Sequence, residues 1–233
     1  VFVPANEAYR ERRDAGEFQG ERGEAELVRW KYQRYIKNYL RCINGIDKSV
    51  GRLLAALDEA GLAEDTIVVY SSDQGFYLGE HGWYDKRWMY EESLRLPLIV
   101  RWPGVIEPGR TDAHLVQNLD FAQTFLEAAG VEAPAHMQGL SLMPLLRGDA
   151  DPTWRDAIYY EYHEVGVHNV PRHYGVRTDR YKLIHYHDTD EWELIDLEVD
   201  PLELRSFHDD PAYAEVRAGL EQRLAELRDE YEA

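Results

Sequence analysis

A carboxylate and an amide follow directly after a short apolar segment near the middle of the chain. Residues 66–72 are rich in β-branched side chains, and Asp73, Gln74 and Gly75 come next. In open sheets the ligand crevice lies beyond the carboxyl ends of the strands. Oxygens from Asp73 and Gln74 suit a hard divalent cation such as Ca²⁺ or Mg²⁺, and Gly75 lets the backbone turn without a Cβ. Two ligands do not complete such a site, and an aspartate that only caps the loop is the alternative.

A second group of polar residues lies in the aromatic loop that follows. Residues 79–82 are Gly-Glu-His-Gly, and Lys86 comes four residues later. A lysine near a divalent ion can stabilise charge on the oxygens of a transferring sulfuryl or phosphoryl group. We therefore take Lys86 and His81 as candidate catalytic residues. The alternatives are a solvated Lys86 and, favoured for this residue, a structural His81 that hydrogen-bonds to the loop backbone.

The elements around these residues indicate an α/β architecture. Apolar residues recur every three or four positions over residues 24–57, which predicts a long amphipathic helix that ends before Gly61. The nearly continuous apolar character of residues 66–72 predicts a strand buried on both faces, as in a parallel sheet covered by helices. Residues 97–102 predict a second strand, and residues 5–23, without periodicity, predict a loop.

One further element completes this part of the chain, and a different pattern follows it. A helix capped by Asn118 or Asp120 is expected to end at Gly130. From about residue 155, short Tyr- and Ile-rich segments separated by turn residues predict a small antiparallel sheet. A last helix with one apolar stripe follows. The segments are 157–163, 174–178, 181–187 and 191–197, and the helix is 211–231. We expect residues 1–150 to be part of an α/β domain and residues 151–233 to form an α+β subdomain.

Composition excludes several classes of protein. The 233 residues carry 26 basic and 44 acidic side chains, a formal net charge of −18, which disfavours nucleic acid as a partner. No apolar run is long enough to span a membrane. The single cysteine, Cys42, excludes an intramolecular disulfide and a thiolate-only metal site, and its place on the apolar stripe predicts a buried side chain.

One short segment runs against the acidic composition. Residues 172–182 include three arginines, one lysine and His173 against a single aspartate. Such a local excess of positive charge suits an anion-binding site, and a solvated strand face is an equally weighted alternative. His185 and His187 share one face of the same predicted sheet. A zinc pair there is less favoured than two exposed strand histidines.

Residues 66–104, TIVVYSSDQGFYLGEHGWYDKRWMYEESLRLPLIVRWPG, resemble the C-terminal half of the catalytic domain of the type I sulfatases. Shared features are the strand that ends in Ser-Asp, the GEHG turn, and a lysine 13 residues after the aspartate, as Lys86 follows Asp73. The resemblance continues through residues 117–130 and 176–184. It ends in residues 193–201, which are similar to the family's YDL..DP segment.

The resemblance implies a fold and a chemistry. The fold is part of an alkaline-phosphatase-like sandwich, a sheet between helices, followed by the four-stranded antiparallel subdomain with its C-terminal helix. The activity is hydrolysis of sulfate esters by a formylglycine beside one Ca²⁺. By motif, Asp73 and Gln74 correspond to two metal ligands and Lys86 to the lysine that contacts the sulfate. The family's usual locations are periplasmic, secreted or lysosomal.

The sequence lacks several parts of the family's active site. No Cys or Ser begins an x-Pro-x-Arg motif, and Cys42 lies in the middle of a predicted helix. Two further metal-binding aspartates and the upstream basic residues are also missing. We therefore expect the chain to begin partway through a longer enzyme and to be inactive alone.

Residues 168–177, HNVPRHYGVR, are similar to a subgroup that acts on 6-O-sulfated N-acetylglucosamine in glycosaminoglycans or mucins. This resemblance makes His173, Asn169 and Arg177 candidate substrate-binding residues for a sulfated carbohydrate. A turn and strand packed in the subdomain is the alternative. A phosphodiesterase or phosphonate monoester hydrolase of the same superfamily, and a non-catalytic glycan-binding fragment, also stay open.

Overall fold

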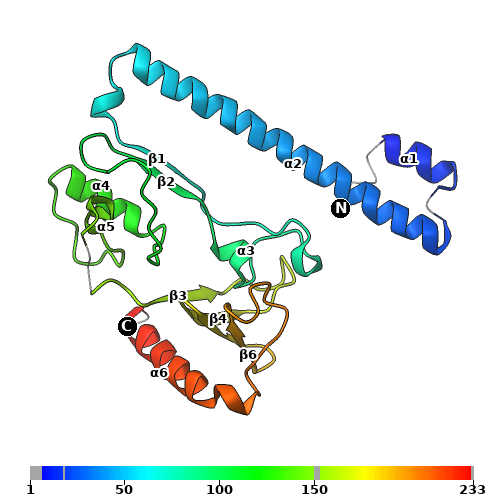
Figure 1. The fold of residues 1–233 in the computed structure, drawn as a ribbon. Helices are drawn as coiled ribbons and strands as arrows, with labels where there is room; N and C mark the ends of the chain where they lie inside the picture. The colour runs from blue at the N-terminus through cyan, green and yellow to red at the C-terminus, as the bar shows by residue number, and fades with distance from the viewer. Residues whose placement is uncertain (1–6, 18, 150–152, 232–233) are drawn as a thin grey trace. The chain divides into compact units, whose positions relative to one another are not determined.

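The computed structural model describes residues 7–17, 19–149 and 153–231, and it divides into two compact units, Val1–Thr66 and Ile67–Ala233 (Figure 1). The expected boundary between residues 150 and 151 lies outside the described residues and stays a prediction. No helix in the described part of the chain is both long and apolar enough to cross a membrane.

The first unit is mainly one helix. Helix α2, Gly20–Glu59, ends as predicted at Gly61, where φ is 68° and the Leu62 N–H donates to the carbonyl oxygen of Leu57. This is the usual backbone arrangement at a helix end that carries glycine. The 3₁₀ turn η1, Ala63–Asp65, follows.

Two expectations about the first unit are wrong. Helix α1, Glu7–Asp14, occupies part of the segment expected to be a loop, because Glu, Ala and Arg favour helix without an apolar period. Cys42 is exposed, since in the described residues of α2 only Gly23 is buried.

The second unit begins with a pair of short strands. Strand β1, Val68–Ser71, pairs antiparallel with β2, Leu98–Arg101, so the expected parallel arrangement is not found for this pair. Continuous apolar character reports on burial and not on strand direction. The pair is also less buried than expected, because Tyr70 and Ile99 are exposed. The opposite side chains, which include Val69 and Val100, line a narrow apolar cavity with residues of the next two helices.

Those helices follow in the chain. Helix α4, Asp120–Ala128, ends before Gly130 as predicted, and α5 is Met143–Arg147. The side chain of Asp120 does not cap α4. Asp120 is fully buried instead, where it accepts hydrogen bonds from the N–H groups of Gln117 and Leu140 and pairs with Arg155.

The predicted four-stranded antiparallel sheet is confirmed, in the order β3-β4-β5-β6. Its one face packs against α6, Ala214–Tyr231, whose Leu220, Leu224 and Leu227 are buried there (Figure 1). Its other face is covered by the aromatic loop, through Tyr77, Met89 and others. The strands are β3, Ala157–Tyr162; β4, His173–Thr178; β5, Tyr181–Tyr186; and β6, Glu191–Asp196.

Candidate active site

The end of β1 is held by hydrogen bonds to backbone atoms. The Asn118 side-chain amide donates to the carbonyl oxygen of Asp73 at 2.7 Å, and the Ser72 hydroxyl donates to that of Gln74 at 2.9 Å. The Asp73 side chain is exposed, with the Ser72 hydroxyl 3.4 Å from Oδ1. The turn therefore fixes the main chain and leaves the carboxylate accessible to a ligand.

Gly75 joins this turn to a short helix, α3, Glu91–Leu94. The Gly75 N–H donates to the Ser93 carbonyl oxygen at 2.8 Å, and a Cβ on Gly75 would lie 2.0 Å from the carbonyl oxygen of Glu92. The φ of Gly75 is not in the left-handed region, so the residue is needed for close approach and not for the turn.

Ser93 also positions Lys86. The Ser93 hydroxyl donates to the carbonyl oxygen of Lys86 at 2.6 Å, and the Tyr77 N–H donates to that of Asp85 at 2.7 Å. These bonds bring the backbone at Lys86 beside the turn that carries Asp73. Within the described residues, the half-buried Lys86 side chain has neither an ion pair nor a hydrogen-bond partner. Its ammonium group can therefore meet an anion.

His81 lies inside the aromatic loop, in the 3₁₀ turn η2, Glu80–Gly82, with φ at 52°. Its ring stacks on Tyr90 and Trp83 with centroid distances of 4.7 and 5.6 Å, and its side chain is 10 % exposed. Its Nε2 lies 3.6 Å from Oε2 of Glu92. His81 therefore packs against these two rings, the edge of Tyr77 and one carboxylate, and among the described residues it makes no hydrogen bond to the loop backbone of the kind expected from the sequence.

Arg87 connects this loop to the segment that carries Asn169. Its guanidinium pairs with Asp85, lies 2.7 Å from Nε2 of His168, and lies 3.7 Å from Glu164. Asn169 is exposed and has φ at 53°. Lys86 and Asn169 thus belong to two loops that one arginine holds side by side.

His173 is fully buried within the aromatic side chains of the loop and sheet. Its Nδ1–H donates to the Pro171 carbonyl oxygen at 2.8 Å, while Nε2 has no hydrogen-bond partner among the described residues. Burial lowers the pKa of this imidazole. In this conformation the ring has no exposed surface for a sugar, so His173 can act on one only through the residues packed around it. The rings nearest to it belong to Trp88, Tyr160, Tyr162 and Tyr186.

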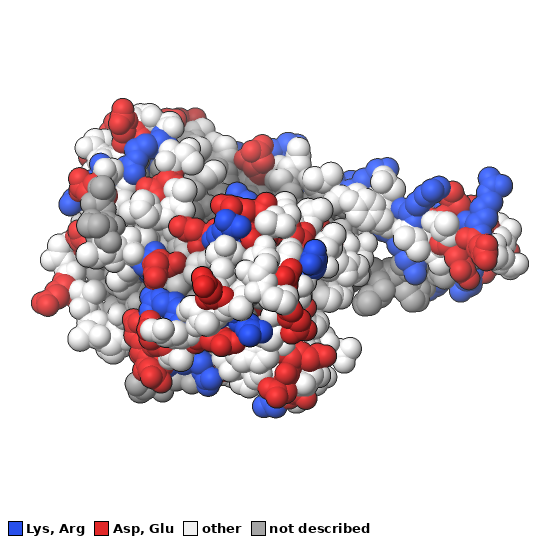
Figure 2. Space-filling view, turned by 60° about the horizontal axis from the view of Figure 1, so that its bottom comes forward, with Lys and Arg blue, Asp and Glu red and all other residues white. Residues whose placement is uncertain are grey.

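The basic stretch of residues 172–182 is occupied by carboxylates. Arg172 pairs with Asp188 at 2.5 Å, and Arg180 pairs with Asp196 at 2.7 Å. Arg177 and Lys182 both contact Glu91, at 3.3 and 2.9 Å. The open anion site is not found, because each of these four cations has a carboxylate partner. The solvated alternative holds only for Arg172 and Arg180, whose side chains are 45 and 39 % exposed. In the part of the surface shown in Figure 2, described basic side chains are likewise interspersed with acidic ones.

The geometry does not assemble a complete metal site. Within the described residues no three His, Cys, Asp or Glu side chains are placed to hold one ion. The donor types at Asp73 and Gln74 fit a hard divalent cation, but they are fewer than the six to eight oxygens that Ca²⁺ takes. His185 lies 2.9 Å from the carboxylate of Asp190, and its ring is 5.9 Å from that of His187.

Comparison with known proteins identifies the chain. Residues 4–131 match the sulfatase family, and residues 79–230 match the family described as N-sulphoglucosamine sulphohydrolase, C-terminal. The chain belongs to the sulfatase family. Each of these matches covers more than half of the sequence.

Individual relatives agree with this assignment. The N-acetylglucosamine-6-O-sulfatase of Bacteroides thetaiotaomicron is 48 % identical over 209 residues, which are 88 % of this sulfatase chain and 38 % of that protein. A solved structure in complex with its substrate D-glucosamine-2-N,6-O-disulfate matches with a TM-score of 0.90 at 45 % identity, over 97 % of this chain and 45 % of that one.

A phosphonate monoester hydrolase of Agrobacterium radiobacter matches with a TM-score of 0.74 at 28 % identity, over 81 % of this sulfatase chain and 40 % of that one. The structural matches confirm the predicted alkaline-phosphatase-like α/β fold. The chain spans less than half the length of these relatives.

Several residues that shape this candidate site carry no signal in the sequence for that role. No pattern marks Ser93, Glu91 or Glu203, and Asn118 fits only the pattern of a helix cap. Lys182 stands in the sequence as one member of a basic segment. Each of these residues acts through a partner distant in the chain, so no local pattern marks it.

Proposed function

We propose that this chain is the C-terminal part of a sulfuric ester hydrolase that releases sulfate from a sulfated glucosamine-type sugar. The supporting observation is the loop that brings the accessible Asp73 turn beside Lys86, whose ammonium group has no partner in the described part of the chain. The similarity to a sulfatase solved with D-glucosamine-2-N,6-O-disulfate supports the class of substrate.

The roles of the site residues follow from their chemistry. Asp73 and Gln74 would supply oxygen ligands to one Ca²⁺, which when bound neutralises charge on the sulfate group. Lys86 would donate to a sulfuryl oxygen whose negative charge grows as the S–O bond breaks. Asn169 would contact the sugar from the loop that Arg87 holds. Arg177 and His173 would support that recognition indirectly, because Arg177 pairs with Glu91 and His173 is fully buried.

The nucleophile is not supplied by these residues. A formylglycine would come from a Cys or Ser motif that this sequence does not contain. The chain alone should therefore release no sulfate, whereas a protein that joins it to a formylglycine-bearing segment should do so.

The test is sulfate release by the full-length protein, matured by a formylglycine-generating enzyme, from 6-O-sulfated N-acetylglucosamine and from D-glucosamine-2-N,6-O-disulfate. A phosphonate monoester is assayed in parallel, because the structural similarity to phosphonate monoester hydrolases supports hydrolysis of phosphonate monoesters as a second candidate function. Preferred turnover of the phosphonate would select the alternative. Binding of the sulfated sugar without turnover of any ester would select a non-catalytic glycan-binding role. Turnover by the isolated chain would contradict the proposal.

The role of Lys86 is tested separately by Lys86→Ala in the full-length protein. Loss of one donor to a developing oxyanion typically lowers the rate by about 10²–10³. The melting temperature should stay unchanged, because the ammonium group has no partner to lose among the described residues. Lys48→Ala, on an exposed position of α2, is the matched control and should change neither quantity. If the activity of Lys86→Ala were close to that of the control, Lys86 would be a solvated residue without a catalytic role.

A further inference from the structure

A fully buried lysine lies at the start of β5, under the site loop. The Lys182 side chain has no exposed surface, and its ammonium group meets three acceptors. These are Oε1 of Glu203 at 2.6 Å, Oε1 of Glu91 at 2.9 Å and the carbonyl oxygen of Met89 at 3.3 Å. The contacts to Glu203 and Met89 are hydrogen bonds and the contact to Glu91 is an ion pair, and all three acceptors come from outside the strand.

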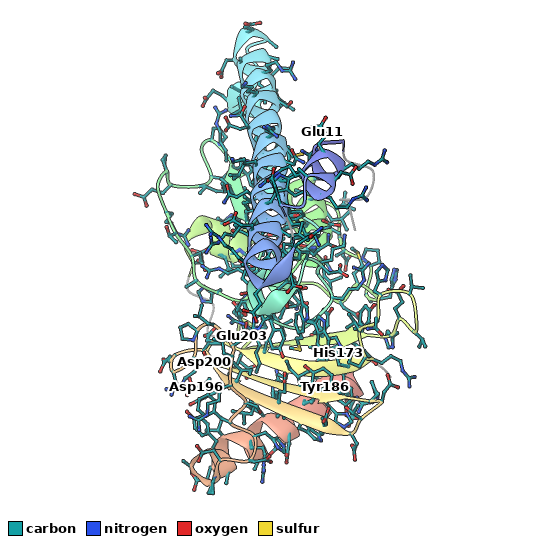
Figure 3. The ribbon with its side chains drawn as sticks, turned by 90° about the vertical axis from the view of Figure 1, so that its right-hand side faces the viewer. Glu11, His173, Tyr186, Asp196, Asp200 and Glu203 are labelled. Carbon is teal, nitrogen blue, oxygen red and sulfur yellow. The ribbon has the colours of Figure 1, made fainter. Side chains whose placement is uncertain are left out.

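Glu203 is aimed at this position by an unusual backbone. Its φ is 52°, a left-handed conformation that is uncommon for a residue other than glycine. Oε2 of Glu203 accepts the N–H of Glu91 at 2.6 Å, so one carboxylate binds both Lys182 and the first residue of α3. A strained backbone persists where the surrounding contacts determine it. Figure 3 places Glu203 at the end of the sheet opposite His173 and Tyr186.

Charge is balanced within this cluster. Arg177 contacts both carboxylate oxygens of Glu91 at 3.3 Å, which gives two cations against two carboxylates. A buried ion pair of this kind is weak support for stability, because removing the charges from water offsets much of their attraction. These contacts do fix position, because they tie β4, β5, α3 and the loop of Glu203 to one another.

Through α3, this cluster of charged residues fixes the position of the proposed sulfate site. The cluster holds Glu91, the first residue of α3, and the third residue of α3 is Ser93. Ser93 binds the Gly75 N–H through its carbonyl oxygen and the Lys86 carbonyl oxygen through its hydroxyl. A shift of α3 would therefore move Gly75 and Lys86 relative to the sheet, although neither touches Lys182.

We propose that Lys182 and Glu203 are positioning residues of the sulfate site, which act through α3 to set where Lys86 and the Asp73 turn lie. This inference rests on the proposed function. It assigns a part in the reaction to two buried residues, one in the antiparallel sheet and one in the loop that follows it.

The experiment compares Lys182→Met, Glu203→Gln and the double variant Lys182→Met/Glu203→Leu in the full-length protein. Each single change leaves a charge or a donor without its partner, and both should lower the melting temperature. The double variant removes both charges and should recover much of it. We expect kcat on the sulfated sugar to fall about 10–100-fold in all three variants, because misplacement of catalytic groups lowers the rate. Equal recovery of melting temperature and kcat in the double variant would show a purely structural role and overturn the inference.

Asp196→Asn is the matched control. Asp196 is also fully buried in this sheet and pairs with Arg180, but its other partners are Tyr213 and backbone N–H groups of residues 198 and 199. It should lower the melting temperature and leave kcat unchanged well below that temperature.

Amide hydrogen exchange separates this inference from the proposed function. In the double variant, peptides from residues 73–95 should exchange faster, while peptides from β4 and β6 should not. Unchanged exchange over residues 73–95 would overturn the inference, even if the wild-type protein released no sulfate and the proposed function failed. Faster exchange there would support it in either case.

Discussion

Replacing Gly75 by alanine tests the contact between the Asp73 turn and α3. The added Cβ would lie 2.0 Å from the carbonyl oxygen of Glu92 and 2.8 Å from that of Arg95. Both are backbone atoms, so no side-chain rotation can relieve the overlap. The turn and α3 must separate by about 1 Å or more to restore van der Waals distance.

The separation has two costs. Overpacking of this kind destabilises by about 1–3 kcal/mol. The 2.8 Å hydrogen bond from the Gly75 N–H to Ser93 would also lengthen or break, and a bond of this type contributes about 0.5–1.5 kcal/mol. We therefore expect Gly75→Ala to lower the free energy of unfolding by about 2–4 kcal/mol. Since Ser93 also binds Lys86, the site should distort, with a loss of about 10²-fold in kcat/KM.

Urea unfolding and the sulfate-release assay measure the two effects on the same preparation. Gly219→Ala in α6 is the control, because no atom outside its own helix backbone lies within 4 Å of the added Cβ. Alanine in a helix is favoured over glycine by about 1 kcal/mol, so the control should be slightly more stable and equally active. A Gly75→Ala variant with wild-type stability and turnover would refute the inference that this close contact sets the distance between the Asp73 turn and α3.

Two further predictions concern pH. The Arg180 guanidinium holds the pKa of Asp196 below its ordinary value. Asp196 therefore contributes stability above about pH 4 that is lost as pH falls through the folded-state pKa. In urea unfolding, the stability difference between wild type and Asp196→Asn should shrink between pH 6 and pH 3, and a constant difference would contradict the pairing. Burial lowers the pKa of His173, so below about pH 6.5 protons bind the unfolded state more strongly than the folded state. The melting temperature of His173→Phe should therefore rise relative to that of wild type when pH is lowered from 7.5 to 5.5. An unchanged difference in melting temperature would mean that the ring is not buried in the neutral form.

The elements that could be predicted are those whose own residues carry the pattern. The apolar stripe of residues 211–231 and the Tyr- and Ile-rich segments that form β3–β6 predicted the subdomain, because these segments bury one face against each other. Gly61 and Gly130 marked two helix ends for a local reason, the left-handed backbone. Helix α1 carries no apolar period, because its stability comes from residue propensity and not from an apolar face.

The parts that could not be predicted depend on partners far along the chain. Arg177 and Lys182 looked like free positive charge because Glu91 lies about 90 residues before them. Asp120 looked like a helix cap, since its partner Arg155 is 35 residues away. Of the site, the sequence supplied Asp73, Gln74 and Lys86 by motif, but not Ser93, whose two hydrogen bonds set their arrangement.

Glu91 has two roles, because it contacts Arg177 and Lys182 and is also the first residue of α3. This has a consequence for how such proteins diverge. An antiparallel sheet whose Arg177 and Lys182 depend on a carboxylate from α3 is not a detachable module. A chimera that exchanged only residues 153–231 with another family member would have to inherit a matching acid at position 91, or it would bury an uncompensated cation. Changes at positions 91, 177, 182 and 203 should therefore be inherited in concert, and drift at one should be tolerated only after compensation at another.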